Sequence, residues 1–293
     1  MAASDQLLVV IDPVARRTDG ESVRIAKDVL SAGAATKVCL PEGPEEFARA
    51  LIRRGARRPV VIGDDGALLR AVSLLHRRRE LAGCALSFVP VGGALSLSRS
   101  LGVPMGTVAA ARAVLDGAER RLDLLVDDSD GVVLGALRIP SLPSRPTAPV
   151  PAGAPGEDVG AHPWLRTCQS LVRTLASRPS RLASAPATGP SRLRIEVDGV
   201  CVVDLDQPVE TVSVTPGGSG TGAEIEVRGV SVGTGSAPLR LLGHKVTVSG
   251  ADFRYGADSV VSGPVRTRTW TVRESAWGLT LPSTPAPILP VTP

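Results

Sequence analysis

Aromatic residues and lysine are scarce in this sequence. Its 293 residues include three Phe, three Trp and one Tyr, so Val, Leu, Ala and Ile must build any hydrophobic core. Arginine supplies nearly all the basic residues and is spread evenly: residues 1–140 hold 19 basic and 17 acidic side chains, and residues 141–293 hold 14 and 12. A nucleic-acid binder usually combines a concentrated basic stripe with stacking aromatics. The composition therefore argues against nucleic acid as a partner.

Cysteine, histidine and long hydrophobic runs are also scarce. The four cysteines form no C-x-x-C pair and the three histidines are scattered, so neither a zinc site nor a disulfide framework is expected. The short apolar run 7–11 has no basic segment before it, which argues against a signal peptide. The uncharged stretch 81–98 is interrupted by Pro90, Gly92 and Gly93, so it is not a membrane span. We therefore expect a cytoplasmic protein, at most peripheral to the inner face of the membrane.

Residues 1–139 alternate between strand and helix patterns. Continuous apolar runs such as 7–11 are typical of strands buried on both faces. Strands are expected at 7–11, 36–40, 59–62, 85–89 and 121–126, and helices at 21–32, 44–54, 67–81 and 107–116. This alternation predicts an N-terminal α/β domain with a parallel sheet.

The composition changes after residue 139. Residues 140–190 are rich in proline and are predicted to be a linker or excursion with one helix at 163–176. From 191 to 282 the sequence shows short alternating strands separated by turn residues, at 193–197, 200–205, 210–214, 224–227, 245–248, 268–272 and 277–281. This pattern predicts a C-terminal all-β domain, most simply a β-sandwich. The proline-rich end, 283–293, is expected to be a disordered tail.

Two glycine-rich turns follow two of the expected buried strands. The first reads Gly-Asp-Asp-Gly-Ala over 63–67, and the second reads Gly-Gly-Ala over 92–94. Ligands of open α/β sheets bind beyond the carboxyl ends of strands, where glycine permits close approach and helix N-termini attract phosphate. Most such glycines simply make tight turns between a strand and a helix. Phosphate binding and a plain turn therefore both remain open on this evidence.

The order and spacing of these motifs resemble the catalytic domain of diacylglycerol kinases and related bacterial lipid kinases, a family that includes the sphingosine kinases. Members carry Asn-Pro after the first strand, where this chain has Asp12-Pro13, and Gly-Gly-Asp-Gly-Thr at the position of 63–67. They continue with Pro-x-Gly-Thr-x-Asn-Asp-Phe-Ala-Arg and Leu-Gly-Ile-Pro, which correspond here to 90–99 and 101–104. The motif that closes the unit corresponds here to Gly117, Arg120, Arg121 and Asp123.

This resemblance implies an N-terminal nucleotide-binding domain, a C-terminal β-sandwich and an active site in the cleft between them. The implied reaction transfers the γ-phosphoryl group of ATP, with Mg²⁺, to the hydroxyl of a lipid substrate at a membrane surface. Asp258 takes the place of the acid suggested to accept the lipid hydroxyl proton. Asp65 takes the place of the family's single aspartate, and we expect it to be a metal ligand. The implied nucleotide-binding residues are Asp12, Gly63, Asp64, Asp65, Gly66, Ala67, Gly92, Gly93 and Arg99. A homodimer remains open as the state of assembly.

The chain departs from the family motifs mainly at positions that should contact phosphate. Asp12 and Asp64 replace an amide and a glycine by carboxylates, and Ala67 and Gly93 each lack an expected hydroxyl. A carboxylate that faces ATP phosphate repels it unless Mg²⁺ intervenes. We therefore predict a lipid kinase with weakened activity. The alternatives are a catalytically inactive binding or regulatory protein and, ranked last, an NAD kinase, whose family shares the loop but not its continuation.

Plainer interpretations of the acidic and basic residues also stay open. Asp64 and Asp65 suit the start of a helix, where carboxylates cap backbone N–H groups. Asp258 lacks the Gly-Glu that follows it in the family, as expected of an ordinary turn aspartate. The arginine clusters at 53–58 and 77–79 are typical of solvated helix ends, with a contact surface for anionic lipid headgroups as the alternative.

Overall fold

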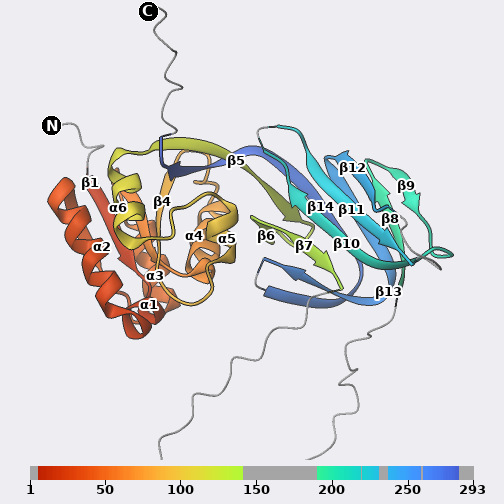
Figure 1. The fold of residues 1–293 in the computed structure, drawn as a ribbon, viewed down its shortest axis with the longest axis horizontal. Helices are drawn as coiled ribbons and strands as arrows, with labels where there is room; N and C mark the ends of the chain where they lie inside the picture. The colour runs from red at the N-terminus through yellow and green to blue at the C-terminus, as the bar shows by residue number, and fades with distance from the viewer. Residues whose placement is uncertain (1–5, 141–189, 219, 231–236, 259, 284–293) are drawn as a thin grey trace, which may run out of the picture. The chain divides into compact units, whose positions relative to one another are not determined.

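A computed structural model of the chain describes residues 6–140, 190–218, 220–230, 237–258 and 260–283 (Figure 1). These residues form a mixed α/β fold with a large sheet-rich portion, which confirms the predicted fold class at that level. The predicted helix 163–176, the rest of 141–189 and the tail from 284 onward lie outside the described residues.

Four parallel strands form the sheet of the N-terminal part, in the order β4-β3-β1-β2. They are β1 (Gln6–Ile11), β2 (Ala35–Cys39), β3 (Arg58–Gly63) and β4 (Ala85–Pro90). β1, β3 and β4 are buried along nearly their whole length, whereas β2 lies at the sheet edge and is partly exposed. The continuous apolar runs in the sequence predict this burial on both faces.

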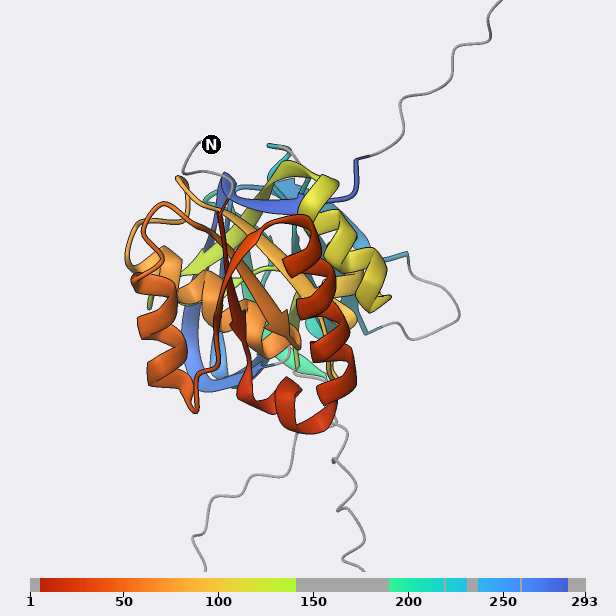
Figure 2. The ribbon, with the colours of Figure 1, turned by 90° about the vertical axis from the view of Figure 1, so that its left-hand side faces the viewer.

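Helices cover both faces of this sheet (Figure 2). They are α1 (Pro13–Thr18), α2 (Gly20–Gly33), α3 (Pro44–Ile52), α4 (Asp65–Arg77), α5 (Ser96–Ser100) and α6 (Thr107–Asp116). Successive side chains of a strand point to opposite faces. Leu7 and Val9 of β1 accordingly pack in the cluster that contains α2 and α6, while Leu8 and Val10 pack with α3 and α4.

The sequence patterns did not predict α1 and α5, and they placed the end of α4 too late. The two missed helices have six and five residues, too few to show a hydrophobic periodicity. α4 ends at Arg77 rather than at residue 81. Arg79 adopts a left-handed conformation (φ +57°) and the N–H of Glu80 donates to the carbonyl of Leu75 at 2.9 Å, which closes the helix.

The sheet-rich portion contains β5 (Ala118–Asp127), β6 (Val132–Val133), β7 (Leu137–Ile139), β8 (Ser191–Val197), β9 (Val200–Val203), β10 (Pro208–Pro216), β11 (Ala223–Gly229), β12 (Leu239–Gly243), β13 (Lys245–Ala257) and β14 (Val260–Leu281). Alternate residues such as Leu193, Ile195 and Val197 of β8 are buried, as period-2 patterning predicts. Most of the inward side chains of these strands form one hydrophobic cluster that includes Trp270, whereas Leu124, Val132 and Trp277 pack in the cluster that contains α3 and α4.

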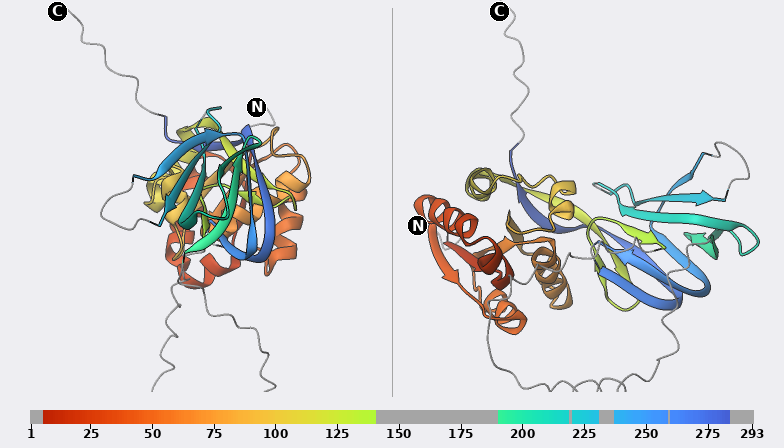
Figure 3. Two further views of the ribbon diagram at one scale, coloured as in Figure 1. Left: turned by 90° about the vertical axis from the view of Figure 1, so that its right-hand side faces the viewer. Right: turned by 60° about the horizontal axis from the view of Figure 1, so that its bottom comes forward.

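β14 corrects the predicted strand pattern near the C-terminus. The expected strands at 268–272 and 277–281 are parts of one strand of 22 residues, with an irregularity opposite β5 between Arg273 and Trp277. The sequence patterns also missed β6, β7 and β12. β14 pairs with β13 and β5, and its last residues pair in parallel with β4, so it connects the two kinds of sheet (Figure 3).

β5, β6 and β7 precede residue 140 yet pair mainly with later strands or with one another. β5 pairs with β14 and β6, while β7 pairs with β10 and β13. The predicted arrangement as two domains, with boundaries at 139 and 191, stays a prediction. Among the described residues, no helix combines the length and the apolar character needed to cross a membrane.

Candidate active site

The turn from β3 to α4 places the first glycine-rich motif at the carboxyl edge of the parallel sheet. Gly63 must lack a side chain, because a Cβ there would lie 2.6 Å from the Cβ of Ala67 and 3.0 Å from that of Asp12. The Asp64 carboxylate accepts the N–H of Ala67 at 3.0 Å and caps α4. The capping interpretation of Asp64 is therefore confirmed, and its Oδ2 atom has no hydrogen bond to another described residue.

Asp65 points away from that cap, toward α5. Its side chain is 1% exposed, and its carboxylate accepts the backbone N–H groups of Leu97 and Ser98 at 2.8 and 2.9 Å. The hydroxyls of Ser98 and Ser96 donate to the same carboxylate. An ionised carboxylate has about four lone-pair sites. A divalent cation at Asp65 would therefore have to displace one of these four donors.

Asp12 forms an ion pair that the sequence did not suggest. Its buried carboxylate caps α1 by accepting the N–H groups of Val14 and Ala15 through Oδ1, at 2.8 and 3.4 Å. Its Oδ2 accepts from the guanidinium of Arg70, a residue of α4. The two partners are 58 residues apart in the chain. The one signal for this ion pair in the sequence is the position of Arg70, four residues and so about one helical turn after Gly66.

The second glycine-rich turn lies against the first. Gly92 has φ +127°, a conformation that favours glycine, and a Cβ there would lie 3.3 Å from the Cβ of Asp64. Gly93 has open space where a side chain would be, with no other atom within 4 Å among the described residues. Arg99 lies exposed on α5 and forms no ion pair with another described residue.

Asp258 lies on the turn between β13 and β14, in a left-handed conformation with φ +52°. Its carboxylate accepts three successive backbone N–H groups, those of Leu134, Gly135 and Ala136, at 2.9, 2.7 and 3.2 Å. Burial raises the pKa of Asp258, and the charge of Asp65 acts in the same direction, while the three N–H groups oppose the shift.

Gly135 brings Asp258 next to α5. A Cβ at Gly135 would lie 2.8 Å from Cδ1 of Leu97 and 3.0 Å from Oδ1 of Asp258. Leu97 in turn donates its N–H to Asp65. The structure therefore brings Asp258 and Asp65 against the same helix, α5, while Asp12 lies against Gly63 of the β3–α4 turn.

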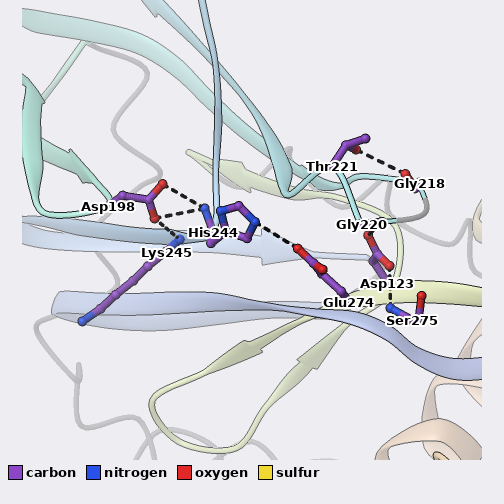
Figure 4. Close-up of polar contacts among 9 residues, drawn as sticks. All are labelled: Asp123, Asp198, Gly218, Gly220, Thr221, His244, Lys245, Glu274 and Ser275. Atoms are coloured by element: carbon purple, nitrogen blue, oxygen red, sulfur yellow. Dashed lines mark hydrogen bonds and ion pairs between the residues drawn. The ribbon is translucent and has the colours of Figure 1, made fainter.

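Other polar and apolar features lie apart from these residues. Figure 4 shows Asp198 accepting the N–H groups of His244 and Lys245, and the imidazole of His244 paired with Glu274 at 2.9 Å. Asp123, from the closing motif, is buried and accepts the N–H groups of Gly220 and Ser275 at 3.2 and 2.7 Å, so it fixes two turns (Figure 4).

An apolar groove of about 840 Å³ runs along α6, with Ile25 and Pro282 in its walls. It contains none of the predicted site residues. No group of three metal-ligating side chains occurs within the described parts of the chain.

The arginine clusters are partly neutralised. Arg54 and Arg78 both pair with Glu80, at 2.6 and 2.9 Å. The guanidinium of Arg58 donates to the carbonyl of Val114 at 3.2 Å. These contacts agree with the interpretation as helix ends, and they leave a smaller positive charge for lipid headgroups than the sequence suggests.

Glycine-rich turns and carboxylates at the carboxyl edge of a parallel sheet occupy the place where open α/β sheets bind their ligands. The family model described as the diacylglycerol kinase catalytic domain matches residues 6–126. Over this segment the chain is similar to that family, as the motifs in the sequence indicate.

Solved structures of similar fold align with most of the chain. A protein described as "a putative diacylglycerol kinase" from Bacillus anthracis strain Sterne is 12% identical, with a TM-score of 0.66 over 96% of this chain and 98% of its own. A diacylglycerol kinase from the same strain is 11% identical, with a TM-score of 0.59 over 97% and 99%. At these identities the likeness establishes the fold alone. No curated protein matches the sequence.

Proposed function

We propose that the protein is an ATP-dependent lipid kinase that transfers the γ-phosphoryl group of ATP to a lipid hydroxyl. The observation that carries this proposal is the position of Asp258 beside α5 and Asp65, next to the glycine-rich turns. It puts a candidate proton acceptor close to the candidate phosphate site, although the residues are almost 200 positions apart in the chain. A lipid substrate implies that the protein works at a membrane surface.

The nucleotide side of the site rests on backbone and on small residues. Gly93 has open space where a side chain would be, so the β4–α5 turn leaves room for the phosphates to approach the main chain. Phosphoryl transfer depends on positioning and on neutralising phosphate charge. Mg²⁺ would enter bound to ATP, and the Oδ2 atom of Asp64 is the carboxylate oxygen at this turn that is free to face it.

The acceptor side rests on Asp258. Two of its hydrogen bonds fall on Oδ1 and one on Oδ2, so Oδ2 has room for the proton of the attacking hydroxyl. Burial raises the pKa of Asp258, which makes it a better proton acceptor than an exposed carboxylate. The roles of Asp65 as a metal ligand and of Arg99 as a phosphate contact stay predictions.

The test is a transfer assay with labelled ATP and diacylglycerol in mixed micelles, preceded by calorimetric titration with Mg-ATP. We expect the wild type to bind Mg-ATP and to label the lipid, and Asp258→Asn to abolish labelling without loss of Mg-ATP binding. Asp252→Asn is the matched control, because Asp252 is an exposed acid of β13, the strand that precedes this turn, and within the described residues its ion pair is with Arg266. A wild type that does not bind Mg-ATP would refute the kinase proposal.

A catalytically inactive binding protein is the second candidate. Both aspartates of the first glycine-rich turn accept backbone N–H groups at the start of a helix, Asp64 for α4 and Asp65 for α5. A structural role of these carboxylates favours this alternative. It predicts nucleotide binding without transfer to any lipid. Replacing the lipid by NAD in the same assay tests the NAD kinase alternative.

A further inference from the structure

Arg70 is a cation fixed beside the first glycine-rich turn. One of its terminal nitrogens donates to the buried Oδ2 atom of Asp12. Its guanidinium lies over the ring of Phe47, with 5.8 Å between Cζ and the ring centroid. Two contacts from different elements, the β1–α1 turn and α3, therefore hold the group in one place.

The guanidinium is held but not saturated. Arginine carries five N–H donors in a planar fork. The bond to Asp12 is the one hydrogen bond that Arg70 makes within the described residues, and its side chain is 45% exposed, whereas that of Asp12 is 2% exposed. The N–H donors of Arg70 that do not face Asp12 are therefore available to an anion from solvent.

The open donors lie at the nucleotide side of the site. The other terminal nitrogen of Arg70 lies 3.5 Å from the position that a Cβ of Gly66 would occupy. The same position lies 3.3 Å from Oδ1 of Asp64, so this edge of the guanidinium faces Gly66 beside the carboxylate that caps α4. This part of the chain also lacks the hydroxyls expected at Ala67 and Gly93, so a side-chain donor to phosphate has to come from another residue.

We propose that Arg70 binds a phosphate group of Mg-ATP at the β3–α4 turn, and that Asp12 positions it for this contact. The inference rests on the proposed kinase function and deepens it. Guanidinium forks bind phosphate through charge-assisted hydrogen bonds that are about twice as strong as neutral ones. The carboxylate gained at Asp12 then supports the phosphate site through Arg70.

Calorimetric titration of the full chain with Mg-ATP and with adenosine tests the inference. We expect Arg70→Gln to weaken Mg-ATP binding at least about tenfold, the effect of losing one charged phosphate contact. Adenosine has no phosphate, so its affinity should not change. Arg24→Gln is the matched control, because Arg24 is a similarly exposed and ion-paired arginine on α2. Arg70→Lys keeps the charge but not the fork, and it should recover less than half of the lost binding free energy.

The outcomes separate this inference from the proposed function. Wild type that fails to bind Mg-ATP overturns both. Wild type that binds while Arg70→Gln and Arg70→Lys bind equally well overturns the inference alone and leaves Arg70 as a structural partner of Asp12. A loss of adenosine affinity together with Mg-ATP affinity also counts against it, since that result reports a distorted site.

Discussion

Asp65 offers the sharpest test of how the site is built. Its buried carboxylate accepts two backbone N–H groups and two hydroxyls, all from the first turn of α5, and no cation of the described chain pairs with it. In Asp65→Asn, the remaining side-chain oxygen can still accept hydrogen bonds, but the new NH₂ group cannot accept from the N–H and O–H groups that it faces. Two hydrogen bonds to a charged group are lost, each worth about 1.5 kcal/mol or more, so we expect a loss of about 3 kcal/mol.

Urea unfolding in the presence of EDTA measures this loss, because EDTA removes any contribution from bound metal. The change should also lower the melting temperature by roughly 6–12 °C for a protein of this size. Asp64→Asn is the matched control: the Asn oxygen can still cap the N–H of Ala67, so we expect a loss of at most about 0.5 kcal/mol. An Asp65→Asn variant as stable as Asp64→Asn would show that the carboxylate is not needed to hold α5.

Two further predictions concern Asp258 and its neighbour Gly135. Burial raises the pKa of Asp258 above its ordinary value of 3.8, so the folded state binds the proton of this carboxyl more tightly than the unfolded state does. The free energy of unfolding therefore falls as the pH rises from about 3.8 through the raised pKa of the folded state. Asp258→Asn should reduce this loss in urea unfolding measured across the acidic range, and an unchanged slope would contradict the assignment. Gly135→Ala should cost about 1–3 kcal/mol and lower any transfer activity, because its Cβ would overlap Leu97 and Asp258. Gly93→Ala meets open space and should unfold like the wild type; equal stability of the two variants would count against the packing described for Gly135.

The sequence predicted the elements whose signals are local. The buried strands β1, β3 and β4 appear as continuous apolar runs, and the alternation of β8 appears as a period of two. The cap at Asp64 follows from an aspartate three residues before its N–H partner. Each of these features depends on neighbours within a few residues, so a single sequence contains the information.

Features that depend on distant partners could not be predicted in the same way. Asp65 accepts from residues 32 and 33 positions later, and Asp258 accepts from residues 122 to 124 positions earlier. The single strand β14 was divided in the prediction because polar residues interrupt its apolar pattern, although pairing with β13 and β5 keeps it continuous. Such pairing satisfies backbone groups whatever the side chains are, and it leaves little trace in the pattern.

Asp12 shows how a charge count from the sequence can mislead. If Asp12 is counted as an isolated anion near ATP, its carboxylate is expected to repel the phosphates and to weaken nucleotide binding. In the structure its charge is matched by Arg70, which lies 58 residues later and keeps most of its donors open. The balance at the turn then depends on Asp64, which Mg²⁺ can neutralise, rather than on two uncompensated carboxylates. If Arg70→Gln lowers Mg-ATP affinity while Arg24→Gln does not, the substitutions in the nucleotide motifs have changed how the phosphate is held without removing the means to hold it.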